Sequence, residues 1–279
     1  MLTALTVNVP EKRKGILGLV DKFRRDKVDI QLKKARGVSL KHITYTSYSE
    51  KLKLEYIDHL IGAQRNHLIC VENLAFPKNS GYRRFSAPDF SYRLCTNMAL
   101  SALRNCKQSE NLCVGIYDPD ANSTDIVSDV LKHCVDVRII TDNSELYRPE
   151  LEIAMDELGA TAILTENRCE LDKCNFIIAP IQICEALPIK IDSVVLTTGC
   201  PKEKVTGLVY HKYYLKMPNG FDLIKPEELD DEYFCSALYS LAAQYELGSV
   251  VPTLCSSYST SQTLKSLCAY LDNLSTKYP

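Results

Sequence analysis

The chain has 279 residues, of which 46% are hydrophobic and 24% are charged, with 11 glycines and 12 prolines. This composition excludes disordered, collagen-like and low-complexity classes, and it predicts one large domain or two modest ones. No apolar run approaches the roughly 18 residues of a membrane span, and residues 1–14 lack the apolar core of a signal peptide. We therefore expect a soluble, cytoplasmic protein that does not bind a membrane.

The net charge of −2 conceals an uneven distribution of charged residues along the chain. Residues 1–111 contain 20 Lys and Arg against 10 Asp and Glu, whereas residues 112–279 contain 13 against 25. This asymmetry predicts two units: a basic N-terminal α+β unit over residues 1–110 and a second unit over residues 111–279. The basic unit is either an anion-binding unit or ordinary solvated surface. A nucleic-acid interface is disfavoured, because the basic residues between Lys12 and Arg36 lack a series of interleaved aromatic residues.

The 12 cysteines are predicted to be free thiols. Most of them lie inside apolar runs, and the sequence contains no Cys-x-x-Cys pair. Cys169, Cys174 and Cys184 come nearest to the spacing of metal ligands, but they lack a compact fourth partner. We therefore expect buried thiols and no bound metal.

The hydrophobic pattern predicts few regular elements in the first unit. Residues 1–41 are expected to form short strands or an exposed amphipathic segment. The elements expected after them are a strand at 43–48, a helix at 49–62, a strand at 67–71, a loop at 72–89 and a helix from 89 or 91 to 104.

From residue 112 onward, buried strands alternate with helices. Residues 112–117 (LCVGIY) are a continuous apolar run, which is typical of a strand buried on both faces. Further strands are expected at 137–141, 161–164, 175–179, 193–198 and 207–215, with helices at about 123–134, 149–158, 228–247 and 261–274. This alternation predicts an α/β fold with a doubly wound parallel sheet. The C-terminal helices are expected to pack back on the first unit.

The turn after the first buried strand is the first candidate site. Ligands of an open α/β sheet bind beyond the carboxyl ends of its strands, next to the N-termini of the helices. The candidate ligand-binding residues at this edge are Asp118, Asp120, Asn122, Ser123, Thr124, Asp142 and Pro180.

The spacing from residues 112–117 to Asp142 resembles the Rossmann dinucleotide-binding unit, over residues 111–200. In that family an acidic residue after the second strand binds the adenosine ribose. Residues 175–180 (NFIIAP) are similar to the segment that runs beneath the nicotinamide. The resemblance implies a Rossmann-like fold with NAD(P) as the cofactor. The order of the units also resembles that of shikimate dehydrogenase-type enzymes, whose substrate-binding motifs are absent from residues 1–110.

The glycine-rich motif of the Rossmann family is absent. Residues 118–123 read Asp-Pro-Asp-Ala-Asn-Ser, where G-x-G-x-x-G would let the backbone approach a pyrophosphate. Two carboxylates would repel that group, and Pro119 has no N–H to donate. Two functions stay open: a divergent nucleotide- or NAD(P)-binding protein, with an oxidoreductase as the enzymatic interpretation, or a non-enzymatic small-ligand or partner-binding protein that has lost the phosphate loop.

A metal-dependent phosphoryl-transfer enzyme is the third alternative. Asp118 and Asp120 resemble the first motif of haloacid-dehalogenase-type phosphatases, in which the first Asp is the nucleophile, and Thr141 matches the second motif. The pair also resembles the topoisomerase–primase metal motif, with Glu72 as its glutamate. No acidic pair follows a later strand to hold Mg²⁺, so no metal ligand is assigned.

Arg83 and Arg84 form a second candidate site, for an anion. They lie between aromatic residues on a predicted loop, where paired guanidinium groups bind a carboxylate or a phosphate. We expect one of them to face the start of the helix at Ser123, so that an anion is held from two sides.

Overall fold

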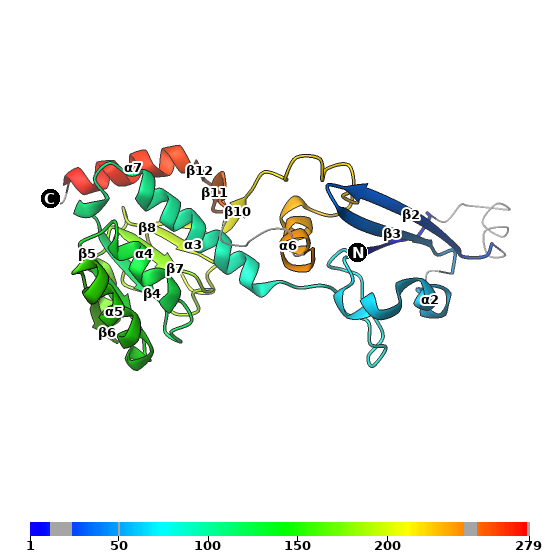
Figure 1. Ribbon diagram of the computed structural model, residues 1–279, viewed down its shortest axis with the longest axis horizontal. Coiled ribbons are helices and arrows are strands. Elements are labelled where there is room, and N and C mark those ends of the chain that lie inside the picture. The colour runs from blue at the N-terminus through cyan, green and yellow to red at the C-terminus, as the bar shows by residue number, and fades with distance from the viewer. Residues whose placement is uncertain (12–23, 50, 243–249, 278–279) are drawn as a thin grey trace. The chain divides into compact units, whose positions relative to one another are not determined.

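The computed structural model describes residues 1–11, 24–49, 51–242 and 250–277 (Figure 1). The chain forms two compact units, unit 1 of Met1–Ala87 with Met217–Glu246 and unit 2 of Pro88–Lys216 with Leu247–Pro279. Within the described ranges, no helix is long and apolar enough to cross a membrane.

Unit 1 contains a three-stranded sheet in the order β1-β3-β2. Its strands are β1 (Leu2–Asn8), β2 (Lys27–Ala35) and β3 (Val38–Thr46). β3 pairs with β1 in parallel and with β2 antiparallel. Leu40, Ile43 and Tyr45 of this central strand are fully buried, so β3 supplies the core of the sheet.

The segment that follows β3 is less regular than the sequence predicts. The prediction of one helix at 49–62 is wrong. The chain there forms the short elements η1 (Leu54–Tyr56), α2 (Asp58–Ile61) and η2 (Gly62–His67). The Ser47 hydroxyl donates to the Lys51 carbonyl at 2.9 Å and accepts from its N–H at 3.1 Å. Such local bonds compete with helix formation. The strand expected at 67–71 is reduced to single bridges at Leu68 and Ile69.

Helix α6 (Asp231–Leu241) belongs to unit 1 although it comes late in the chain. The Asp230 carboxylate caps it by accepting from the Tyr233 N–H at 2.7 Å. The Tyr233 hydroxyl in turn donates to the Phe85 carbonyl at 3.2 Å, which attaches the helix to the rest of the unit. Residues 243–247 of the helix expected at 228–247 lie outside the described residues.

Unit 2 is built on a six-stranded sheet in the order β6-β5-β4-β7-β8-β9. The strands are β4 (Cys113–Tyr117), β5 (Asp136–Ile140), β6 (Ile163–Thr165), β7 (Phe176–Ala179), β8 (Val194–Thr197) and β9 (Leu208–Tyr210). Every neighbouring pair is parallel. Numbered from β4, the order is 3-2-1-4-5-6, so unit 2 has a Rossmann-like, doubly wound α/β fold.

Two different layers cover the large sheet. The helical layer contains α3 (Pro88–Asn105), α4 (Val127–Leu131, preceded by η4, Thr124–Ile126) and α5 (Ser144–Leu158). Figure 1 shows α3 side by side with the last helix, α7 (Leu264–Lys277). The crossover from β6 to β7 lies on the other face and contains only η5 (Arg168–Lys173). Loops complete that layer, with Ile183, Leu187 and Ile189 in its core.

The prediction of a single strand at 207–215 is wrong, because this segment forms two short strands that belong to different sheets. β9 ends at Tyr210, and β10 (Lys212–Tyr214) joins a small antiparallel sheet with β11 (Leu254–Ser256) and β12 (Ser261–Thr263). The N–H of His211, the residue between β9 and β10, donates to the Ser256 carbonyl at 3.0 Å. This bond directs the chain away from the large sheet. β12 also delays the start of the last helix from residue 261 to Leu264.

The compact units divide the chain before α3, whereas the sequence-based boundary lies after it, near residue 110. The physical reason is the packing of α3, whose Leu94, Met98 and Leu103 are fully buried. The helix contacts β7, β8 and α7, all of which belong to unit 2.

The crossover between β6 and β7 packs closely against β4 at Gly115. A Cβ atom there would lie 3.0 Å from Cys174 Sγ and 3.1 Å from Leu171 Cδ2. We expect Gly115→Ala to lower the free energy of unfolding by about 1–3 kcal/mol, because the core would be overpacked. Urea unfolding followed by circular dichroism measures the change. Cys174→Ala removes one of the two obstructing atoms, so it should recover part of the loss in the double variant, and an unchanged stability of Gly115→Ala would contradict the prediction.

Candidate functional site

Polar side chains gather at the carboxyl edge of the large sheet. Parallel strands end at one edge, so residues that follow different strands become neighbours there. Tyr117 and Asp118 lie at the end of β4, Asp142 follows β5, and Arg168 and Glu185 follow β6 and β7. Five positions spread over 69 residues of sequence therefore form one set.

Asp118 is the most enclosed member of this set, since none of its surface is exposed. Its Oδ2 accepts hydrogen bonds from the Ser123 N–H at 2.7 Å and from the Tyr147 hydroxyl at 2.6 Å. In the described part of the chain, Asp118 Oδ1 and the Ser123 hydroxyl have no hydrogen-bond partner. Burial and the adjacent Asp118 raise the pKa of Tyr147, which therefore stays a hydrogen-bond donor. The carboxylate thus connects the end of β4, the start of η4 and helix α5.

The turn after β4 is held by hydrogen bonds between the Pro119 carbonyl and the residues that follow β5. The Pro119 carbonyl accepts from the Asp142 N–H at 3.0 Å, from the Thr141 hydroxyl at 3.2 Å and from the Asn143 side chain at 3.1 Å. Ala121 has a φ of 55°, in the left-handed region that favours glycine. The turn is therefore tight without the glycines of a dinucleotide-binding loop.

Asp142 belongs to an ion-pair network at the same edge. Both terminal nitrogens of Arg168 bind its two carboxylate oxygens, one of them at 2.8 Å. Arg168 Nε also donates to Glu185 Oε1 at 3.2 Å, and the Tyr117 hydroxyl donates to the same oxygen. The Arg168 guanidinium holds the pKa of Asp142 below its ordinary value, so this half-exposed carboxylate stays ionised. The network presents a fixed negative charge to solvent.

The other sequence-predicted residues of this edge are placed differently. Asp120 and Asn122 are exposed on the turn, Thr124 is half-buried at the start of η4, and Pro180 is buried directly after β7. Ser123 is buried with Asp118 and has no exposed surface. Their roles in binding stay predictions.

Sequence reasoning missed Tyr147, Arg168 and Glu185. Arg168 lies three residues after the end of β6. A charged residue directly after a predicted strand was therefore the sequence signal that could have identified it. Glu185 lies in the irregular loop after β7, and Tyr147 is buried inside α5. Neither of these two carried a sequence signal.

The arginines of the second candidate site differ in their surroundings. Arg84 Nε donates to the Cys70 carbonyl at 2.9 Å, and its guanidinium carbon lies 3.8 Å from the centre of the Tyr233 ring. These contacts hold Arg84 within unit 1, while Arg83 is exposed. Ser123 belongs to unit 2, so the expected facing of either arginine and Ser123 stays a prediction.

The geometry of Asp118 does not favour the phosphoryl-transfer alternative. A nucleophilic carboxylate must reach its substrate, whereas Asp118 is fully buried and bonded to Tyr147. Over the described ranges, no three His, Cys, Asp or Glu side chains gather in a way that could hold a metal ion.

Unit 2 also contains a cavity of about 400 Å³ beside β9, lined in part by Cys200, His211 and Tyr258. The His211 ring is buried, with its centroid 5.0 Å from that of the Tyr258 ring. Burial lowers the pKa of His211, so its imidazole is neutral at pH 7.

No protein-family model and no curated protein matches the chain. The Thermococcus litoralis Δ1-pyrroline-2-carboxylate reductase in complex with NADH and L-proline is 13% identical over 44% of this chain and 41% of that chain, with a TM-score of 0.30. L-tryptophan dehydrogenase from Nostoc punctiforme is 8% identical over 73% of this chain and 64% of that chain, with a TM-score of 0.31. The alignments thus span less than two thirds of either structure, and at these scores they carry no argument about function.

Tyr147→Phe tests the role of Asp118 in stability. The variant removes one of the two hydrogen bonds of a fully buried carboxylate, so we expect the free energy of unfolding to fall by about 1.5–3 kcal/mol. Tyr92→Phe is the matched control, because the Tyr92 hydroxyl donates to Asp125, whose side chain is 47% exposed. Water replaces that lost bond, and the effect should stay below about 1 kcal/mol. Equal losses in the two variants, measured by urea unfolding, would show that the burial of Asp118 has no energetic consequence.

Proposed function

We propose that unit 2 binds a small ligand that contains a ribose, as in a nucleoside or a nucleotide, at the carboxyl edge of its large sheet. The observation that carries this proposal is the ionised carboxylate of Asp142, which is half-exposed and held by Arg168 at the end of β5. In a sheet of the order 3-2-1-4-5-6, this is the position of the acidic residue that binds ribose hydroxyls.

The bonding of Asp142 leaves it able to accept more hydrogen bonds. Each carboxylate oxygen has two lone pairs, and Arg168 occupies one on each oxygen. The remaining lone pairs suit two neighbouring hydroxyl groups, such as the 2′ and 3′ hydroxyls of a ribose. Arg168 thus orients the acceptor and keeps it charged, while the hydroxyls donate to it.

The charge of the network favours an unphosphorylated ribose. Asp142 and Glu185 carry two negative charges against the single positive charge of Arg168, whose guanidinium nitrogens already bond to both carboxylates. A 2′-phosphate would therefore meet a net negative charge and no free guanidinium arm. Among dinucleotides, this supports NAD over NADP.

The turn after β4 does not fit a pyrophosphate. The Ser123 N–H that a phosphate would use donates to Asp118 instead, and both residues are fully buried. Helix α4 has only five residues, so its dipole adds little to anion binding. A dinucleotide would be held through its ribose and not through its phosphates. This favours a ligand of the size of a nucleoside over a dinucleotide. We derive no hydride-transfer step, and oxidoreductase activity stays a prediction.

Calorimetric titration of the full chain with adenosine, guanosine, uridine, AMP, NAD and NADP tests the proposal. We expect a ribonucleoside to bind, its 2′-deoxy form to bind more weakly, and NAD to bind about fivefold or more tightly than NADP, since one unit-charge repulsion at short range is worth about 1 kcal/mol. Asp142→Asn should weaken binding about ten- to hundredfold, because it removes hydrogen bonds to a charged acceptor.

Asp136→Asn is the matched control for Asp142→Asn. Asp136 lies at the opposite end of β5 and also pairs with an arginine, Arg138, at 3.1 Å. This variant should bind like the unaltered chain. Absence of binding by every probe, or equal losses in the two variants, would refute the proposal.

The proposal also predicts how binding depends on pH. Because the pKa of Asp142 lies below its ordinary value of 3.8, the carboxylate is ionised throughout the range from pH 8 to 5. Its contribution should be constant over that range and should be lost only as the pH falls through the lowered pKa. A decline of affinity between pH 7 and 5, measured by the same titration, would assign the binding to a different group.

A further inference from the structure

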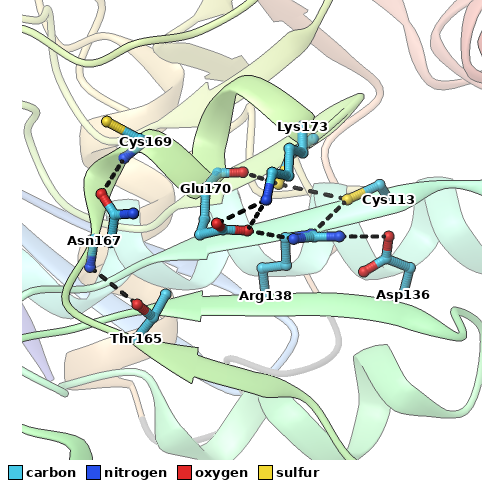
Figure 2. A network of polar contacts seen from close by, with 9 residues as sticks. Cys113, Asp136, Arg138, Thr165, Asn167, Cys169, Glu170 and Lys173 are labelled. Atoms are coloured by element: carbon cyan, nitrogen blue, oxygen red, sulfur yellow. Dashed lines mark hydrogen bonds and ion pairs between the residues drawn. The ribbon is translucent and has the colours of Figure 1, made fainter.

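Two cysteine sulfurs meet at the amino end of the large sheet, the edge opposite to Asp142. Cys113 begins β4, Cys174 precedes β7, and their Sγ atoms lie 3.7 Å apart (Figure 2). Asn175 fixes the backbone between them, since its N–H donates to the Cys113 carbonyl at 2.8 Å and its side chain accepts from the Cys113 N–H at 3.1 Å. The two thiols are therefore held in contact by strand pairing.

A guanidinium group is aimed at one of these sulfurs. Arg138 Nε lies 3.2 Å from Cys113 Sγ, while its two terminal nitrogens bind Glu170 and Asp136. Figure 2 shows Arg138 between the two carboxylates, and Lys173 also bonds to Glu170. The carboxylates fix the planar guanidinium, so that its Nε–H points at the sulfur. Only 14% of the Arg138 side chain is exposed, which limits screening by water.

The two thiols differ in acidity. The hydrogen bond with Cys174 lowers the pKa of Cys113, and the Arg138 guanidinium lowers it further. Burial and the nearby Asp136 oppose both effects, and the net shift is downward. The contact with Cys113 and burial raise the pKa of Cys174. Cys113 is half-buried and Cys174 is buried, so the more acidic thiol is also the more accessible one. A thiolate beside a guanidinium reacts with a peroxide more readily than a buried thiol without a cation, so Cys113 is the site of the first oxidation.

We propose that Cys113 and Cys174 form an oxidative modification site, at which a hydroperoxide converts the two thiols into an intramolecular disulfide. The inference is independent of the proposed ligand site and concerns the opposite edge of the sheet. The disulfide would link the start of β4 to the end of the crossover that leads into β7. To form it, the two sulfurs must move from 3.7 Å apart to the S–S bond length of about 2.05 Å.

The reaction takes place in two balanced steps. The Cys113 thiolate attacks one oxygen of hydrogen peroxide, the O–O bond breaks, and hydroxide leaves, so that Cys113 becomes a sulfenic acid. Cys174 then attacks the Cys113 sulfur, the S–O bond breaks, and the oxygen leaves as hydroxide. One of the two hydroxides takes the Cys174 proton, and the other takes the proton given up when the Cys113 thiolate formed. Two thiols are oxidised by two electrons, and one peroxide is reduced to two waters.

Unit 2 contains a second cysteine pair that serves as an internal control. Cys106 follows α3, and its Sγ lies 3.7 Å from the carbonyl oxygen of Cys268 in α7. Both thiols are buried and bond to each other, which lowers the pKa of Cys268, but within the described ranges no arginine or lysine acts on either of them. If closeness of two buried thiols were sufficient, this pair would oxidise as readily as Cys113 and Cys174.

The test treats the folded full-length chain with equimolar hydrogen peroxide, blocks the remaining thiols by alkylation, and maps disulfides by mass spectrometry without reduction. We expect the Cys113–Cys174 linkage to be the first disulfide to form. Cys174→Ser should leave Cys113 as a sulfenic acid that dimedone traps, whereas Cys113→Ser should show neither the linkage nor the trapped product at residue 174. Exposed Cys169 and Cys184 can react by exposure alone, so only products at residues 113 and 174 are scored.

Arg138→Met tests the guanidinium separately. We expect the linkage to form about tenfold more slowly, the effect of raising the pKa of an attacking thiol by about one unit. Arg93→Met is the matched control, because Arg93 pairs with Asp125 at 2.9 Å and contacts neither thiol; it should leave the rate unchanged. Formation of the Cys106–Cys268 linkage at an equal rate, no trapping in Cys174→Ser, or an unchanged rate in Arg138→Met would each overturn the proposal.

Discussion

The hydrogen bonds of the buried Asp118 carboxylate are the contacts on which the carboxyl edge of the large sheet depends. A carboxylate without exposed surface must find its partners within the protein, and here they are the Ser123 N–H and the Tyr147 hydroxyl. These bonds bring together the end of β4, the turn that follows it and helix α5. The tight backbone at Ala121 and the contacts of the Pro119 carbonyl follow from the same folded turn.

This arrangement also limits the chemistry of the site. In glycine-rich Rossmann loops, backbone N–H groups at the start of the first helix bind a phosphate of the ligand. Here a side-chain oxygen of Asp118 accepts the Ser123 N–H at that position. The charged groups that remain partly exposed at this edge are those of Asp142, Arg168 and Glu185, and the proposed ribose site rests on them.

The packing on the other face of the sheet, and the contacts at its amino end, depend on the short crossover between β6 and β7. A crossover that contains only η5 can lie close to the sheet, and it does so where Gly115 leaves room for Leu171 and Cys174. The same close approach brings Cys174 to Cys113 and Glu170 to Arg138. The absence of a side chain at Gly115 therefore allows the crossover to pack against β4 and allows the two thiols to come into contact.

The sequence by itself determined the fold class of unit 2 and predicted the edge of the sheet at which its candidate site lies. The apolar run at residues 112–117 is long enough to indicate a strand buried on both faces, and the alternation of such strands with helices predicts parallel crossovers. The position of Asp142 after the second of these strands follows from the same pattern. In the first unit, by contrast, the polar bonds of Ser47 overrode a helical pattern, because local side-chain bonds and apolar periodicity compete over the same few residues.

Only the tertiary structure decided which side chains meet. Arg168 lies 26 residues from Asp142, and Tyr147 lies 29 residues from Asp118. Contacts at such separations depend on strand order, register and the direction of each side chain. The local pattern of apolar residues determines none of these. The division of the chain at His211 has the same origin, since a carbonyl 45 residues later accepts its N–H. The sequence thus specifies elements through local apolar patterns, whereas the chemistry of the site arises from pairings that exist only after those elements have packed.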